Sequence, residues 1–206
     1  MINTARLRCT IGWLAMMLPW VVLILSLVFG YGFPDSISMT YYRETCITPF
    51  MIVLGSASLL LFSYKGYDWQ DDLVCSLTGL FGLCICLFPC ATNLFAYVGT
   101  FLIPQEVSGI LHNISAAIFF ILLSYNSLFL FTKSGEVMSE TKKKRNIIYR
   151  VCGIGMVASF VLLIPVTVFS IYGGIWTVEA IALTFFGISW LTKANYYPWL
   201  FAEKAC

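Results

Sequence analysis

The single histidine of the chain lies in a polar stripe within an otherwise apolar stretch. Ser108, His112 and Ser115 follow one another at spacings of four and three residues, so in a helix they share one face, and Asn126 continues that face. Imidazole gains or loses a proton readily near neutral pH, so His112 could act as a general base or contact a ligand headgroup. The other interpretation is that His112 forms a hydrogen bond with a serine and holds two helices together. The sequence leaves both open.

A second group of polar residues lies in the segment that joins the first two apolar stretches. It contains Asp35, Ser36, Ser38, Tyr41, Tyr42, Arg43 and Glu44. Glu179 lies near the start of the last apolar stretch and should reach the same side of a membrane as this segment and His112. The Arg43 guanidinium suits a bidentate contact with phosphate or carboxylate; the alternative is an ion pair with Glu44 or Glu179. We therefore expect an outward-facing polar pocket for a ligand, lined by Ser36, Ser38, Tyr41, Tyr42, Arg43, His112 and Glu179.

Charged residues also gather in two segments that should face the opposite side. The first reads YKGYDWQDD (64–72), and the second, KSGEVMSETKKKR (133–145), is the longest polar linker. Acidic side chains favour the positive end of a helix, so we expect Asp71 and Asp72 to cap the third span. The basic run 142–145 is expected to contact anionic lipid headgroups. The alternative is an ionic latch between the two segments, formed by Asp68, Asp72, Lys143 and Arg145.

The sequence contains no motif that requires enzyme chemistry. A membrane metal site takes three or four ligands, often several histidines, and this chain has one histidine. A triad of Ser38, His112 and Glu179 can be drawn, but no glycine-flanked nucleophile turn accompanies it. Phosphate-binding glycine loops, dinucleotide motifs and paired haem-ligating histidines are also absent from the sequence. An enzyme is therefore not favoured, and we expect neither metal nor cofactor; if the chain is an enzyme, these three residues are the catalytic candidates.

Eight cysteines raise the question of a disulfide or a metal centre. Cys84, Cys86 and Cys90 lie in an apolar stretch and match no zinc-binding spacing, so we interpret them as small hydrophobic residues. Cys46 and Cys90 are both expected near the outer surface. Whether these two form a disulfide in an oxidising compartment stays open.

The composition indicates a protein that lies in a lipid bilayer. Hydrophobic residues make up 60% and charged residues 11% of the 206 positions, and the mean hydropathy is +0.87. Soluble domains have about 45–50% apolar and about 25% charged residues. The net charge of +2 provides no basic face for nucleic acid. Crossing a bilayer takes about 20 apolar residues in a helix. Six stretches qualify: 11–30, 47–64, 73–90, 107–131, 147–172 and 175–192. We expect an all-α polytopic membrane protein, a bundle of six transmembrane helices in one domain over 1–206.

Lysine and arginine are distributed unequally between the segments that join these stretches. Eleven of the twelve lie on the side of the N-terminus, and Arg43 lies on the other side. Cytoplasmic loops of membrane proteins are enriched in these residues. We therefore expect both termini in the cytoplasm.

Several short strings of the chain, taken together, resemble those of a known family. They are SISMTYY with Arg43 (36–43), SYKGYD with Asp72 (63–72), LFP (87–89), His112 with the alanine at 116 and phenylalanines at 119–120, and FGISWLTK (186–193). Over about 10–193 the chain resembles uncharacterised bacterial six-span membrane proteins. It is distantly similar to eukaryotic damage-regulated autophagy modulators and GPI-anchor-remodelling membrane proteins. The resemblance implies a lipid-associated six-helix bundle in a bacterial inner membrane. It points to Ser36, Ser38, Tyr42, Arg43, Asp68, Asp72 and His112.

The expected function is the binding of a lipid or small amphiphile in the outward-facing pocket, without catalysis. Two alternatives remain: a lipid-modifying enzyme with His112 as general base, and a transporter or channel subunit. Membrane lipids are the expected partners and nucleic acid is not. Whether the chain also forms a homo-oligomer or binds another membrane protein is left open.

Overall fold

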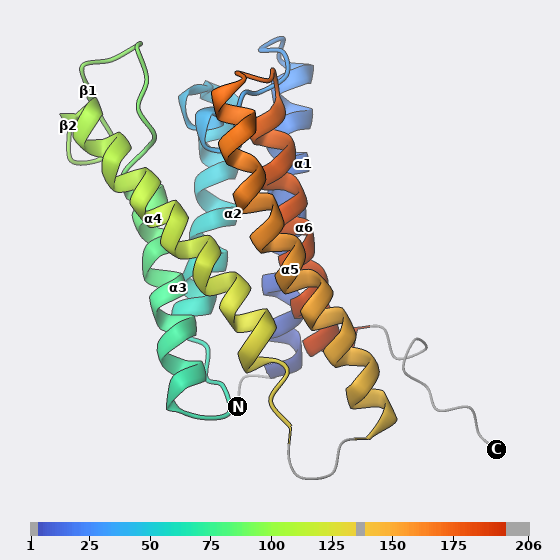
Figure 1. Cartoon of the computed structure of the whole chain (residues 1–206). Helices are drawn as coiled ribbons and strands as arrows, with labels where there is room; N and C mark the ends of the chain where they lie inside the picture. The colour runs from blue at the N-terminus through green and yellow to red at the C-terminus, as the bar shows by residue number, and fades with distance from the viewer. Residues whose placement is uncertain (1–3, 135–138, 197–206) are drawn as a thin grey trace.

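The computed structural model describes residues 4–134 and 139–196, which form a bundle of six long helices (Figure 1). The helices are α1 (Thr4–Val28), α2 (Glu44–Phe62), α3 (Trp69–Leu87), α4 (Gln105–Tyr125), α5 (Glu140–Val168) and α6 (Gly174–Lys193). The shorter elements are the 3-10 helix η1 (Ser38–Tyr42), the π-helical turn η2 (Asn126–Leu130) and the antiparallel strands β1 (Tyr97–Val98) and β2 (Ile103–Pro104).

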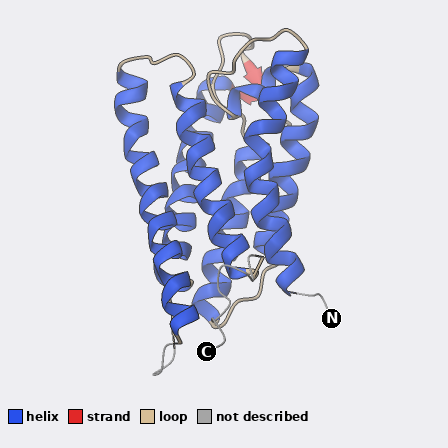
Figure 2. Cartoon of the chain, turned by 90° about the vertical axis from the view of Figure 1, so that its right-hand side faces the viewer, coloured by secondary structure: helices blue, strands red, loops and turns tan. Residues whose placement is uncertain are grey.

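Each helix packs against the next one in the chain, and α6 closes the bundle against α1. Consecutive helices run in opposite directions (Figure 1), so the connections alternate between two ends. Residues 29–43, 88–104 and 169–173 lie at the end that carries the two strands, which we call the sheet end (Figure 2). Residues 63–68 and 131–134 lie at the opposite end, the linker end, together with both ends of the described chain. Residues from separate helices can therefore meet at either of the two ends of the bundle.

All six helices are long and apolar enough to cross a membrane, in agreement with the six predicted stretches and with a multi-pass membrane protein. The helical class is confirmed, but several boundaries differ. Helices α1 and α5 begin at Thr4 and Glu140 rather than at 11 and 147. The first turns of α1 and α5 are polar, and a hydropathy pattern excludes them although the helices begin there.

Helix α6 is the most buried of the six and α5 the least. In the most apolar 18-residue stretch of each helix, 61% of the residues are buried in α6 and 22% in α5. Helices α1 and α6 approach closely where Gly12 faces Gly187; a Cβ atom on Gly187 would lie 2.8 Å from the Gly12 carbonyl oxygen. Small residues at such contacts allow close packing of helices in lipid. Helix α6, which carries Glu179, is therefore the most buried helix of the bundle.

The polar stripe of α4 faces the interior of the bundle, as predicted. Ser108, His112 and Ser115 are buried, and Asn126 in η2 is 1% exposed. The Asn126 amide nitrogen lies 3.1 Å from the thiol of Cys75 on α3. The stripe brings His112 to the inner face of α4 near the sheet end.

Candidate functional site

His112 joins three parts of the sheet end through its two ring nitrogens. Nδ1 lies 2.8 Å from the carbonyl oxygen of Phe88, which follows α3, and Nε2 lies 3.0 Å from the Oγ atom of Ser38 in η1. A carbonyl only accepts, so in the neutral ring Nδ1 carries the proton and donates to Phe88, while Nε2 accepts from the Ser38 hydroxyl. The serine contact that the sequence suggested for His112 is therefore present, with Ser38 as the partner.

Further hydrogen bonds fasten the first loop at the sheet end. The Tyr42 hydroxyl donates to the Cys90 carbonyl oxygen at 2.5 Å. Within the loop, the Ser36 hydroxyl accepts a hydrogen bond from the Met39 amide at 3.0 Å. Burial raises the pKa of Tyr42 above its ordinary value, so the phenol stays protonated and continues to donate. The loop is thus a fixed part of the bundle's end.

Glu179 brings a carboxylate to the same end from α6. Its Oε2 atom accepts a hydrogen bond from the Ile37 amide at 2.7 Å, and the nearby Trp176 amide donates to the Asp35 carbonyl oxygen at 3.0 Å. Glu179 and Ser38 border one narrow cavity of about 40 Å³. The rest of its wall is apolar, with Leu18, Ile37, Phe50, Leu54, Ile85, Ala116, Phe119, Phe120 and Leu183. His112 lies behind Ser38 and fixes its hydroxyl.

Arg43 lies apart from this cavity. Its hydrogen bonds within the described part of the chain go to the carbonyl oxygens of residues 32–33, the shorter at 2.9 Å, and no ion pair with Glu44 or Glu179 is formed. The guanidinium carbon lies 5.8 Å from the centroid of the Tyr31 ring. The suggested ion pair is therefore wrong: the loop turns back so that its own carbonyls receive the guanidinium.

Two predicted ligand-binding residues border a different cavity. The rings of Tyr41 and Tyr42 meet edge to face at 5.3 Å and line an open cavity of about 300 Å³ that extends to β1. Ser38 and Glu179 share the smaller cavity, and Ser36 is used within the loop. The residues expected in one pocket are thus divided among separate places at the sheet end.

At the linker end, Asp68 is the N-cap of α3 and accepts hydrogen bonds from two amides of the first turn, at 3.0 and 3.1 Å. Asp71 and Asp72, the predicted caps, accept from amides of residues 66–67 instead, and Asp72 pairs with Lys65 at 3.2 Å. The predicted cap was wrong because an N-cap needs the extended backbone that Asp68 has, at φ −142° and ψ 177°.

The ionic contact between the two linker-end segments uses Lys133, which the sequence interpretation missed. Its ammonium lies 2.8 Å from the Asp68 carboxylate, and this hydrogen bond lowers the pKa of Asp68. Lys143 pairs with Glu140 in its own helix at 2.6 Å rather than with Asp68. Arg145 borders a large cavity at this end. An ionic contact therefore joins the two segments, but it is formed by Lys133 with Asp68, whereas Asp72 and Lys143 pair with Lys65 and Glu140.

Cys46 and Cys90 are free thiols, so the disulfide that the sequence left open is not formed. The Cys46 sulfur lies 3.6 Å from the Val22 carbonyl oxygen, and the Cys90 sulfur lies 3.4 Å from the sulfur of Met39. Within residues 4–134 and 139–196, no three His, Cys, Asp or Glu side chains gather closely enough to hold a metal ion.

Comparison with protein families, characterised proteins and solved structures gives no match to this chain. The resemblance to the bacterial six-span family thus stays a prediction from short strings. The function is inferred below from the geometry of the chain's own residues.

Proposed function

We propose that the chain is a multi-pass protein of a bacterial inner membrane that binds the polar group of a lipid or other small amphiphile at the sheet end. The observation that carries the proposal is the Glu179 carboxylate, which belongs to a helix long enough to span the membrane and faces a narrow, largely apolar cavity. The ligand's polar group binds between Glu179 and Ser38.

The distribution of basic residues supports a cytoplasmic linker end. The chain has twelve Lys and Arg, of which Lys204 lies outside the described residues. Ten of the other eleven lie toward the linker end, and Arg43 lies at the sheet end. Since cytoplasmic loops are rich in Lys and Arg, the cavity at the sheet end faces away from the cytoplasm.

The outer surface of α5 supports contact with lipid. Ile154, Val161, Ile164 and Val168 recur along one side of the helix, and each is more than half exposed. A long exposed row of branched apolar residues is unfavourable in water and suits acyl chains.

Glu179 and Ser38 offer complementary sites for a polar ligand group. A carboxylate at membrane depth is costly unless it is hydrogen-bonded. Among the described residues the Ile37 amide is the one donor to Glu179, and it binds Oε2. Oε1 therefore accepts from a ligand hydroxyl or ammonium group. Ser38 donates to His112 and keeps a lone pair for a second ligand donor.

The size of the cavity limits what enters it. Its volume of about 40 Å³ exceeds the roughly 10–15 Å³ that one buried water needs, and so it leaves room for a small group only. A hydroxymethyl or aminomethyl group fits, with its first carbons against Leu18 and Phe119. The remainder of the amphiphile then lies along the apolar surface of the bundle.

Lipid retention tests the proposal. Protein in nanodiscs of native lipid extract is re-purified in mild detergent, and its lipids are quantified by mass spectrometry for wild type, Glu179→Gln and Glu106→Gln. Glu106 is an exposed carboxylate in the first turn of α4 and serves as the matched control. Loss of a hydrogen bond to a charged group corresponds to at least about tenfold in affinity. One hydroxyl- or amine-bearing lipid class should therefore be retained by wild type and Glu106→Gln and depleted about tenfold in Glu179→Gln. An unchanged profile in Glu179→Gln would show the proposal to be wrong.

A second candidate is a lipid-modifying enzyme, which the contact between Ser38 and His112 favours. Ser38 Oγ lies 3.0 Å from Nε2, and the other ring nitrogen is held by the Phe88 carbonyl oxygen. A hydroxyl beside an oriented base is the arrangement that activates a nucleophile. New lipid product that accumulates during incubation with wild type, and not with Ser38→Ala or His112→Ala, would establish this function. No product from wild type would exclude it for the lipids present.

A further inference from the structure

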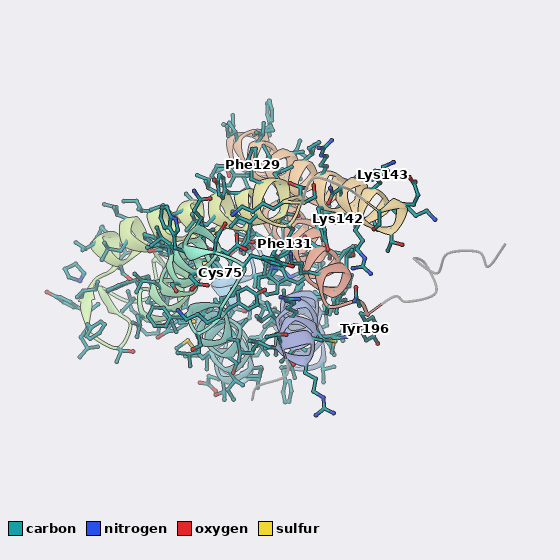
Figure 3. The ribbon with its side chains drawn as sticks, turned by 90° about the horizontal axis from the view of Figure 1, so that it is seen from below. Cys75, Phe129, Phe131, Lys142, Lys143 and Tyr196 are labelled. Carbon is teal, nitrogen blue, oxygen red and sulfur yellow. The ribbon has the colours of Figure 1, made fainter. Side chains whose placement is uncertain are left out.

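A cavity of about 620 Å³ lies at the linker end, where the start of α1, the start of α5 and the end of α6 converge. Its charged side chains are Arg8, Lys133, Lys142, Arg145, Lys193 and Asp68. Figure 3 looks onto this end and shows Lys142 of α5 beside Phe131, near the middle of the bundle. Among the described residues, five basic groups and one acidic group thus surround one space.

Three of the basic groups are held by neutral partners. Arg8 Nε donates to the Tyr64 hydroxyl at 2.9 Å, and Lys142 Nζ donates to the Phe131 carbonyl oxygen at 2.7 Å. The Lys193 ammonium lies 4.9 Å from the centroid of the Phe131 ring, and within the described chain it forms no ion pair. These contacts fix the three cations without neutralising their charge.

The acidic residue that lines the cavity, Asp68, does not neutralise its basic residues. The Asp68 carboxylate is already paired with Lys133 at 2.8 Å. Lys133 also pairs with Asp71 at 3.0 Å. With these contacts set aside, Arg8, Lys142 and Lys193 still contribute positive charge to the same space. Like charges repel, and the repulsion grows where water is partly excluded. An anion is therefore the occupant whose charge complements the wall.

The burial of these side chains distinguishes the cavity from a simple membrane anchor. Lys143 and Lys144, in the same basic run, are exposed, as side chains that reach anionic lipid headgroups should be. Arg8, Lys142 and Lys193 are half-buried and line the cavity instead. A role in topology alone gives no reason for three cations to turn inward.

Aromatic side chains pack against one another next to the basic groups of this cavity. Trp190 packs against Tyr64 and Phe131 at ring-centroid distances of 5.1 and 5.3 Å, and Tyr149 packs against Phe131 at 5.4 Å. The Lys142 ammonium lies 5.6 Å from the centroid of Tyr149. Cations held on aromatic faces before binding lose little conformational freedom when a ligand arrives.

We infer that this cavity binds a phosphate ester, carried by a phospholipid headgroup or by a small soluble metabolite. Guanidinium and ammonium groups form strong charge-assisted hydrogen bonds with phosphate oxygens. The volume of about 620 Å³ lies within the usual range of small-molecule sites, about 300–1,000 Å³, and leaves room for the alcohol attached to the phosphate. The side chains of Tyr67 and Tyr149 also line the cavity, beside that alcohol. This site is separate from the sheet-end cavity and does not depend on the function proposed for it.

Thermal unfolding of the whole protein in dodecyl maltoside, which carries no phosphate, tests the inference. The two probes are short-chain phosphatidylglycerol in the micelle and glycerol 3-phosphate in the buffer, each compared with sodium chloride at equal ionic strength. A ligand that binds the folded state raises its unfolding temperature by mass action. A saturable rise with phosphatidylglycerol alone identifies a lipid headgroup as the source, and a rise with glycerol 3-phosphate identifies a soluble ester.

Three variants locate the effect. Lys193→Gln removes a cavity charge and should need about ten times more probe for the same rise. Lys193→Arg keeps the charge and should behave as wild type, and so should Lys144→Gln, which removes an exposed charge from the same end. If Lys193→Gln fails to fold without probe, Arg8→Gln takes its place. The inference is overturned if neither probe raises the unfolding temperature. It is also overturned if Lys144→Gln weakens the rise as much as Lys193→Gln does.

Discussion

Replacing His112 by alanine should destabilise the bundle by about 3 kcal/mol. The imidazole is 4% exposed and binds the Phe88 carbonyl oxygen and the Ser38 hydroxyl at 2.8 and 3.0 Å. A buried polar group left without its partner costs about 1–3 kcal/mol, which applies to the Phe88 carbonyl. Ser38 borders a cavity and is less affected. The space left by the ring adds about 1–2 kcal/mol of lost packing.

The assay is thermal unfolding in detergent, followed by the fraction of protein that remains monodisperse after heating. For a chain of this length, 1 kcal/mol corresponds to about 2–4 °C in unfolding temperature, so His112→Ala should unfold about 6–12 °C below wild type. Asn113→Ala is the matched control, because Asn113 is the next residue of α4 and is exposed. If the two variants unfold within a degree of each other, the contacts of His112 do not hold α3, α4 and η1 together and the reasoning is refuted.

Three further predictions concern packing, ionisation and thiol reactivity. Gly79→Ala should destabilise the contact between α2 and α3 by about 1–3 kcal/mol because its Cβ would collide with α2 backbone, whereas Gly55→Ala has open space and should gain up to about 1 kcal/mol. Equal unfolding temperatures for the two variants would contradict this. The Lys133 contact lowers the pKa of Asp68, so its stabilisation is complete above about pH 4, the ordinary Asp pKa, and is lost as pH falls through the lower folded-state pKa. The unfolding temperature measured from pH 5 to pH 2 should therefore fall more steeply in wild type than in Asp68→Asn. Parallel curves of unfolding temperature against pH would contradict this contribution of Asp68. Burial raises the pKa of the Cys90 thiol to about 12, so maleimide at pH 7 should label native Cys90 at least about a hundredfold more slowly than in the unfolded chain. Similar rates in both states would refute the burial argument.

The six helices and the inward face of α4 could be predicted because both depend on local patterns. Hydropathy over about 20 residues identifies a span, and the spacing of Ser108, His112 and Ser115 places them on one side of a helix. The starts of α1 and α5 could not be predicted from hydropathy, because their first turns are polar and yet continue the helix.

The candidate site was predicted in its residue types more than in its contacts. Topology alone brings Ser38, His112 and Glu179 to the sheet end, and the structure places them there. Which groups pair depends on the path of the loop, and no local pattern indicates that Arg43 would bind carbonyl oxygens of residues 32–33.

The cavity at the linker end was missed for a related reason. Arg8, Lys142 and Lys193 come from three different helices, and more than a hundred residues separate Arg8 from Lys142 in the sequence. Each looks like an ordinary flanking charge of a membrane span. Their convergence follows from the closure of α6 against α1 and α5, which only the packed bundle reveals.

Photo-crosslinking tests the proposed lipid site most directly. An amphiphile that carries a hydroxyl or amine headgroup and a diazirine on its first carbons is incorporated in nanodiscs with the wild-type protein, activated by light and mapped by peptide mass spectrometry. We expect labels on peptides that contain Ser38 and Glu179, and we expect these labels to be lost when excess unlabelled native lipid is added. Labels confined to the exposed face of α5, or labels that native lipid does not displace, would contradict it.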